Sequence, residues 1–223
     1  MLHPRPLNKH QITHAALVAL VISLFSGPSL AGRPLAVDDA NVNDVGAGHV
    51  ETWLNRHADS TNMWNVATAY GLADGMEVGL TLAGGASSEL ATTVLQAKFQ
   101  LTPAVSNGCN FGTSLGVSQP HNGGANTPFV NGLLSCNAEF GSVHINAGAN
   151  RPPEGPTLAT WGIAVERGFG AHTAHLEAFG QEQTSPTVQV GWRTDVAKNV
   201  QLDATLGRAS SETVLSLGMK FQF

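Results

Sequence analysis

The chain has 223 residues, of which 16 are acidic and 11 are basic, and its formal net charge is −5 at neutral pH. Only 12% of the residues are charged, about half the share of a typical soluble domain, and no basic run is present, which argues against a nucleic-acid partner. After the N-terminal region no stretch approaches eighteen apolar residues, so the sequence predicts no transmembrane helix.

The N-terminal region has the three parts of a secretory signal peptide. Arg5 and Lys9 precede an apolar run at 15–25, and small residues surround Ala31. We expect residues 1–31 to be removed by cleavage after Ala31; a short membrane anchor is the alternative. The mature chain would keep nine basic and sixteen acidic residues, a net charge of about −7.

Residues 32–48 follow without any periodicity and are rich in Asp, Asn and Gly. We interpret them as an irregular N-terminal segment. Their length and polarity suggest the hypothesis that they fold into the interior of the following domain, 49–223, as a plug.

Twelve segments of the remaining chain have strand character. In the third, Met76, Val78 and Leu80 alternate with Glu77 and Gly79, which is the two-residue period of a strand. Turn-forming residues separate the segments. The two longest Gly-, Pro- and Asn-rich links, 119–127 and 149–157, are both expected at the external end of the strands. The predicted strands are 49–56, 63–70, 76–83, 90–101, 109–118, 129–136, 142–148, 158–167, 172–180, 187–194, 200–208 and 213–223.

The last strand alternates up to a terminal aromatic residue, Phe223. This ending resembles the C-terminal strand by which bacterial outer-membrane barrels are recognised, so we expect Phe223 to act as an assembly signal for the barrel-assembly machinery. Aromatic side chains on the apolar faces lie near strand ends, as expected of two girdles at the headgroup level. These residues are Trp64, Tyr70, Phe99, Phe111, Trp161, Trp192 and Phe221.

These patterns predict an all-β fold: a closed antiparallel up-and-down transmembrane β-barrel of about twelve strands, surrounded by the lipid and lipopolysaccharide of the bacterial outer membrane. A soluble sandwich or jelly roll is the alternative. It would place many Lys, Glu and Asp side chains on its exposed faces, whereas the polar faces here carry mostly Gly, Ser, Thr, Asn and Gln.

Eight charged side chains fall on the polar, inward faces of the predicted strands. Arg193 is flanked by strands carrying Glu177 and Asp203, and Lys220 lies beside Glu51 once the barrel closes, so opposite charges can pair across the ladder. Two interpretations remain open. The charges form an internal salt-bridge belt that keeps the wall rigid, or they form a selectivity ring or polar binding site for a solute. The eight are Glu51, Glu77, Lys98, Glu166, Glu177, Arg193, Asp203 and Lys220.

Cys109 opens the fifth predicted strand and Cys136 closes the sixth, so both lie near one end of neighbouring antiparallel strands. Because the periplasm is oxidising, a disulfide is a candidate, with two free buried thiols as the alternative. The mature histidines show no metal-binding pattern: His172 and His175 are three residues apart and point to opposite faces of a strand. No cofactor or metal is expected.

Ser142 and His144 share an inward face, which raises the minor alternative of an outer-membrane lipid hydrolase. Ser142 sits beside a turn, and no hydrolase motif surrounds it, so we expect no enzyme activity. Twelve strands would give a lumen between the filled interior of eight-stranded barrels and the open channel of barrels with sixteen to eighteen strands, and we expect a channel or facilitator for a small-molecule solute. The alternative is a closed structural barrel that supports the envelope or makes surface contacts.

Short motifs distributed over most of the mature chain resemble the MetA-pathway phenol-degradation family of outer-membrane barrels and putative transporters. That resemblance implies uptake or export of small, often aromatic or apolar molecules. The motifs are Arg33-Pro34-Leu35, Asp38-Asp39-Ala40, Glu51-Thr52-Trp53, Tyr70-Gly71-Leu72, Glu77-Val78-Gly79, Gly191-Trp192-Arg193 and Leu202-Asp203-Ala204.

Overall fold

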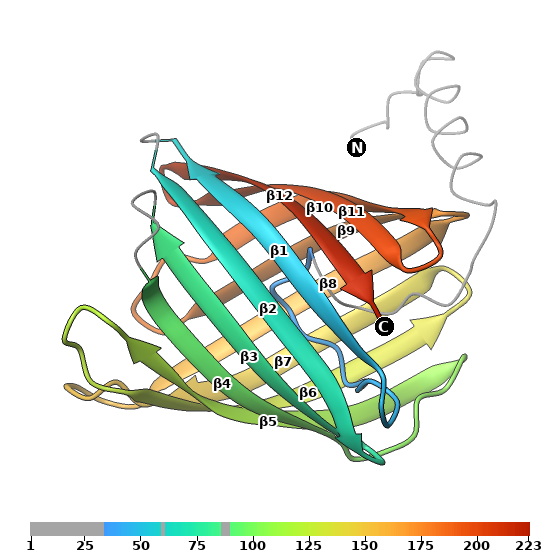
Figure 1. Ribbon diagram of the computed structural model, residues 1–223, viewed down its shortest axis with the longest axis horizontal. Helices are drawn as coiled ribbons and strands as arrows, with labels where there is room; N and C mark the ends of the chain where they lie inside the picture. The colour runs from blue at the N-terminus through green and yellow to red at the C-terminus, as the bar shows by residue number, and fades with distance from the viewer. Residues whose placement is uncertain (1–33, 59–60, 86–89) are drawn as a thin grey trace, which may run out of the picture.

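The computed structural model describes residues 34–58, 61–85 and 90–223, which form a closed antiparallel barrel of twelve strands (Figure 1). Each strand pairs with its neighbours in sequence, and β1 pairs with β12 to close the ring, so the predicted fold class is confirmed. The predicted signal peptide lies outside the described residues. The strands are β1 Gly48–His57, β2 Asn62–Ala73, β3 Met76–Gly85, β4 Leu90–Gln100, β5 Gly108–Pro120, β6 Thr127–Ala138, β7 Gly141–Asn150, β8 Leu158–Phe169, β9 His172–Gln181, β10 Thr187–Ala197, β11 Val200–Ala209 and β12 Glu212–Gln222.

The barrel closes at the C-terminal residue. The amide of Gly48 donates to the carbonyl oxygen of Phe223 at 2.9 Å, and the amide of Phe223 donates to the carbonyl oxygen of Gly48 at 2.9 Å. The ring of Phe223 lies against Gly48 and stacks on Phe221 at 6.5 Å between centroids. We call the end of the barrel where β1 begins and β12 finishes the proximal end, and the opposite end the distal end.

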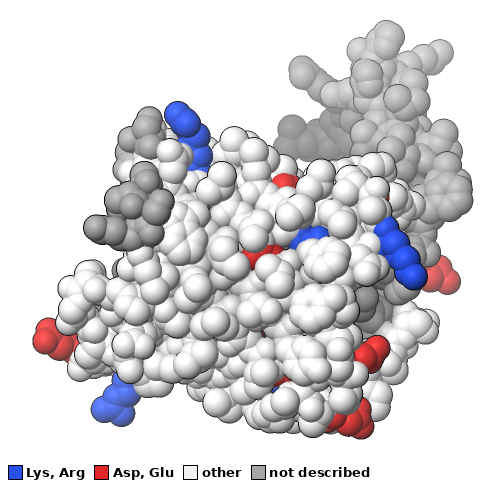
Figure 2. Space-filling model, in the orientation of Figure 1, with Lys and Arg blue, Asp and Glu red and all other residues white. Residues whose placement is uncertain are grey.

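Alternation along each strand directs apolar side chains to the outside of the barrel. Leu95, Leu176 and Leu217 are more than half exposed although they lie within strands. Figure 2 shows that the visible wall is mostly uncharged, with protruding Lys, Arg, Asp and Glu side chains near its edges and only small charged areas near its middle. Such an apolar outer wall matches a lipid environment better than water. None of the described residues forms a helix long and apolar enough to cross a membrane.

Most of the predicted girdle aromatics lie on this outer wall. Tyr70, Phe111, Trp161, Trp192 and Phe221 have exposed fractions between 42% and 51%, and Trp64 and Phe99 are partly exposed. Trp192 is displaced from the expected strand end, because β10 continues to Ala197 past a register shift, which leaves Trp192 in mid-strand. Its indole nevertheless stacks on Phe169, at the proximal end of β8, with ring centroids 6.2 Å apart.

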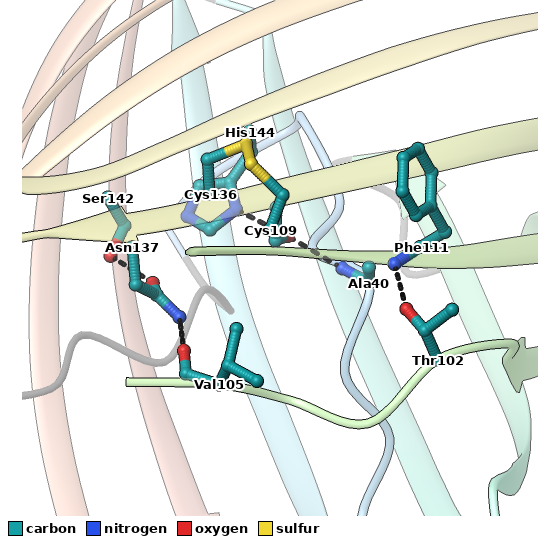
Figure 3. The surroundings of a disulfide bond; sticks show 10 residues. Ala40, Thr102, Val105, Cys109, Phe111, Cys136, Asn137, Ser142 and His144 are labelled. Carbon is teal, nitrogen blue, oxygen red and sulfur yellow. Dashed lines mark hydrogen bonds between the residues drawn. A yellow bond between two sulfur atoms is a disulfide. The ribbon is translucent and has the colours of Figure 1, made fainter. Parts of the chain in front are cut away.

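A disulfide joins Cys109 and Cys136, which are register partners on β5 and β6 near the proximal end (Figure 3). Two further bonds hold the loop between β4 and β5 against this region. The side-chain amide of Asn137 donates to the carbonyl oxygen of Val105 at 2.7 Å, and the backbone amide of Phe111 donates to Thr102 Oγ1 at 2.8 Å (Figure 3). This part of the proximal rim is therefore fixed both covalently and by hydrogen bonds.

Candidate functional site: the barrel lumen

Residues 34–47, which we call the luminal segment, run inside the barrel (Figure 1). The segment bonds to inward-facing side chains of strands on opposite sides of the ring, from β3 and β4 to β7 and β9. Val37 and Ala40 are 2% and 0% exposed, as core residues would be. The segment thus supplies the apolar contacts that the polar inner wall lacks.

The eight charged residues singled out from the sequence all face the lumen. Seven of them are at most 9% exposed, and the side chain of Lys220 is 11% exposed. Burying a charge is costly unless it is paired and hydrogen-bonded, so the partners of these groups decide what they do. The structure divides them between wall-to-wall pairs and anchors of the luminal segment.

Lys98 on β4 is the main cationic anchor. Its Nζ lies 2.7 Å from Asp38 Oδ1 and 2.7 Å from Asp39 Oδ1, so one ammonium group binds both carboxylates of the segment. Burial raises the pKa of the Asp38 carboxyl, and the attraction of the Lys98 ammonium opposes that shift. The ion pairs join the segment to the wall through charge-assisted bonds, the strongest kind available here.

Glu177 on β9 is the corresponding anionic anchor. Its Oε2 accepts from the amides of Ala36 and Val37 at 2.9 and 2.8 Å, and its Oε1 accepts from Gln189 at 2.6 Å. The expected pairing with Arg193 is wrong in its register: Glu177 lies opposite Gln189, and Arg193 lies opposite Thr173. Sequence spacing identified the neighbouring strands, but the antiparallel register of β9 and β10 places Arg193 four residues along β10 from the partner of Glu177.

Arg193 binds Glu166 on β8 instead, with Nη1 2.6 Å from Oε1. Asp203 is the register partner of Arg193 on β11. A second pair lies across the β1–β12 seam, where Lys220 Nζ is 3.3 Å from Glu51 Oε1. These contacts are wall-to-wall pairs.

Asn146, Glu77 and Ser135 complete the anchoring. Asn146 uses both ends of its amide: Oδ1 accepts from the Asp38 amide at 2.8 Å, and Nδ2 donates to the Asp38 carbonyl at 2.7 Å. Glu77 Oε2 accepts from the backbone and side-chain nitrogens of Asn43 at 2.8 and 2.7 Å. The Ala40 amide donates to Ser135 Oγ at 2.9 Å. The segment is held along most of its length.

Inward-facing glycines give the segment room against the wall. A β-carbon on Gly112 would lie 3.0 Å from the Ala40 carbonyl oxygen, and one on Gly162 would lie 2.7 Å from Val37 Cγ2. A β-carbon on Gly71 would overlap the backbone of residues 43 and 44. Three strands therefore use glycine where the segment passes closest.

The hydroxyl and imidazole groups of the wall form a buried relay that does not suit hydrolysis. Ser135 Oγ lies 2.8 Å from His144 Nδ1, and His144 Nε2 lies 3.4 Å from Glu166 Oε2. All three residues are 0% exposed, and Ser135 already accepts the Ala40 amide. Ser142, the candidate nucleophile of the hydrolase alternative, instead donates to Asn137 Oδ1 at 2.7 Å. The arrangement offers no substrate access to either hydroxyl.

Among the described residues, two cavities border the luminal segment. The proximal cavity, about 430 Å³, extends along β1 to β4 and is lined by charged residues that include Glu51, Glu77, Lys98 and Lys220. The distal cavity, about 420 Å³, lies between β8, β9 and β10 near the distal end. Ala36, Val37, Asn131 and Asn146 border both cavities, so the segment lies between them.

Sequence reasoning missed some lumen residues. Trp53 was quoted only within a motif, yet it shares the inward face of β1 with Glu51 and lines the proximal cavity. Ser135 and Asn110 were not singled out, because a small polar residue on a strand does not reveal its partner. Their partners lie 95 and 69 residues away, in the luminal segment. The alternation placed these side chains inward but could not show what they bind.

A family model described as uncharacterised conserved protein UCP029691 matches residues 19–221. The chain belongs to this family. The MetA-pathway resemblance is not confirmed, because the matching family is this one. Comparison with curated proteins gives no match.

Solved structures support the fold at low sequence identity. The KdgM porin in complex with disordered oligogalacturonate aligns with a TM-score of 0.69 and 12% identity, covering 78% of this chain and 99% of that chain. The NanC porin aligns with a TM-score of 0.65 and 6% identity, covering 77% and 98%. The architecture is therefore that of a porin-like transmembrane β-barrel.

Proposed function

We propose that this protein is a channel of the bacterial outer membrane for small polar solutes, and that the luminal segment closes it at rest. The observation that carries the proposal is a polar lumen with a cavity on each side of an anchored, non-strand segment. The apolar outer wall supports a position in lipid, and the similar KdgM and NanC structures are named porins.

The lining of both cavities argues against the apolar or aromatic solutes that the family resemblance implied. The proximal cavity presents ammonium and carboxylate groups, and the distal cavity presents amides and hydroxyls beside the rings of Trp161 and Phe179. An apolar solute would leave these groups without partners and would pay for their desolvation. A polar solute can replace the water that hydrates them.

Release of the luminal segment should open the path. In Asp38→Asn/Asp39→Asn both ion pairs with Lys98 are lost while the shape of the segment is kept. Breaking a buried ion pair costs about 3 kcal/mol or more, which corresponds to roughly a hundredfold change in the ratio of open to closed channels. Planar-bilayer recordings should therefore show rare, brief openings of the natural protein and much more frequent openings of the double variant.

Glu51→Gln is the matched control, because it removes a wall-to-wall pair with Lys220 and leaves both Lys98 contacts in place. Its frequency of opening should equal that of the natural protein, because the Lys98 anchors are intact. The competing function, a closed structural barrel, is favoured by the number of anchors along the segment. That function would be established if the double variant stayed electrically silent although hydrogen exchange showed the segment released.

A further inference from the structure

The distal cavity differs in chemistry from the proximal cavity. Its volume of about 420 Å³ falls within the usual range for small-molecule sites, about 300–1,000 Å³. Residues near the distal ends of β6, β8, β9 and β10 form its wall together with Thr184 and Ser185 of the β9–β10 loop, and Ala36 and Val37 of the luminal segment also line it. The wall includes Asn131, Thr160, Phe179, Gln181 and Thr187.

None of the described residues that line the distal cavity carries a formal charge. An ionised solute placed there would lose hydration without gaining a counter-charge, which is unfavourable. The proximal cavity, by contrast, is lined by two lysines and several carboxylates. The distal cavity therefore selects against charge, whereas the proximal cavity does not.

The groups that line the distal cavity can both donate and accept hydrogen bonds. Side-chain amides and hydroxyls have this dual capacity, and so do the hydroxyl groups of a sugar. Thr160 donates to Asn131 Oδ1 at 3.1 Å, and Asn150 donates to Gln181 Oε1 at 2.5 Å, so these amides are fixed in orientation by their neighbours. Phe179 adds an apolar surface, which suits the C–H face of a sugar ring.

We infer that the distal cavity is a binding site for neutral polyhydroxylated solutes of about mono- to disaccharide size. As a statement about the transported solute, this inference rests on the proposed channel function. A bound solute would touch Val37, whose amide is held by Glu177 at 2.8 Å. Occupancy of the site is therefore expected to act on the segment that closes the lumen.

The test is calorimetric titration of the full mature barrel in detergent micelles with sucrose, digalacturonate and glucosamine. Sucrose should bind at least tenfold more tightly than the acidic and the basic probe. Phe179→Ala and the double variant Thr160→Val/Thr187→Val should each weaken sucrose binding about tenfold, the effect of losing roughly 1.4 kcal/mol of contact or hydrogen bonding. Thr81→Val, a matched change in the proximal cavity, should leave the affinity unchanged.

Three results would overturn the inference: no measurable heat with sucrose, equal affinity for digalacturonate, or sucrose affinity unaffected by both distal variants. Because the variants alter the apolar and the hydrogen-bonding contacts separately, a folding failure of one leaves the other as a test. Failure of the channel proposal looks different. If the barrel does not conduct but binds sucrose, the binding site is supported and the channel function is refuted. If the barrel conducts but does not bind sucrose, the channel function is supported and the binding site is refuted.

Discussion

Gly71 on β2 is the wall position where the luminal segment tolerates no added atom. A β-carbon there would lie 2.5 Å from the carbonyl oxygen of Asn43 and closer still to that of Asp44. Both obstacles are backbone atoms, so Gly71→Ala cannot be relieved by rotation of a side chain. Reaching ordinary contact at about 3.5 Å requires a displacement of about 1 Å for the Asn43 oxygen and a larger one for the Asp44 oxygen.

That displacement would break specific bonds. Asn43 donates twice to the Glu77 carboxylate, and hydrogen bonds to a charged group are worth about 1.5–3 kcal/mol each. Overpacking adds about 1–3 kcal/mol. Partial relaxation leaves a local loss of about 2–4 kcal/mol, so amide exchange at residues 43–47 should accelerate by about thirtyfold to several hundredfold.

Hydrogen–deuterium exchange of the detergent-solubilised barrel, followed on peptides that cover 34–47, measures this effect. Residues 36–40 should stay protected, because their bonds to Glu177 and Lys98 lie on other strands. Gly79→Ala is the matched control: it also faces the lumen, and its β-carbon would meet its nearest neighbour, the Thr68 carbonyl oxygen, at an ordinary 3.4 Å. Equal exchange in both variants would refute the assigned path of the segment.

Three further changes test the wall. Cys109→Ser/Cys136→Ser should lower the free energy of unfolding by about 2–4 kcal/mol in urea titrations in lipid vesicles, since a cross-link over 27 residues is lost; an unchanged midpoint would contradict this. Phe223→Ala should reduce the yield of folded barrel in gel-shift assays. The free energy of unfolding of the molecules that do fold should change by no more than about 1 kcal/mol, because the backbone bonds of residue 223 to β1 remain. Arg193→Met should destabilise the barrel by about 3–5 kcal/mol, because Glu166 is left buried without its cation. A stable variant with altered ion preference would instead assign Arg193 to selectivity.

The barrel itself was predictable because lipid outside and a polar lumen inside impose opposite demands on alternate residues. Met76 to Leu82 and the strand that ends at Phe223 satisfy that demand in sequence, and both form strands of the closed ring. Strand ends were less predictable. The strand carrying Trp192 continues three residues beyond its expected end, since Asp195 to Ala197 pair with β11 through an irregularity that no two-residue period reveals.

The arrangement of the lumen was less accessible from sequence. The polarity and length of 32–48 allowed the plug hypothesis, but an aperiodic segment does not encode the strands that it will contact. Lys98 illustrates the difficulty: its register partner on β3 is Glu77, yet its closest carboxylates are Asp38 and Asp39, about sixty residues earlier in the chain. Cross-strand pairing predicts partners within the barrel wall, whereas Asp38 and Asp39 belong to the luminal segment, which is not part of the sheet.

The way in which the segment is anchored bears on whether the closure is permanent. Its bonds end on Lys98, Glu177, Asn146 and Ser135, all of which face the lumen and would meet water if the segment left. On release, water replaces the protein partner of each of these groups. The free-energy cost of this replacement is much smaller than that of leaving the same group unpaired in a dry core. Release would also return conformational freedom to the segment, and that entropy favours opening. A structural barrel could fill its interior permanently with side chains from its own strands; a polar lumen filled by a separable chain segment is better suited to opening.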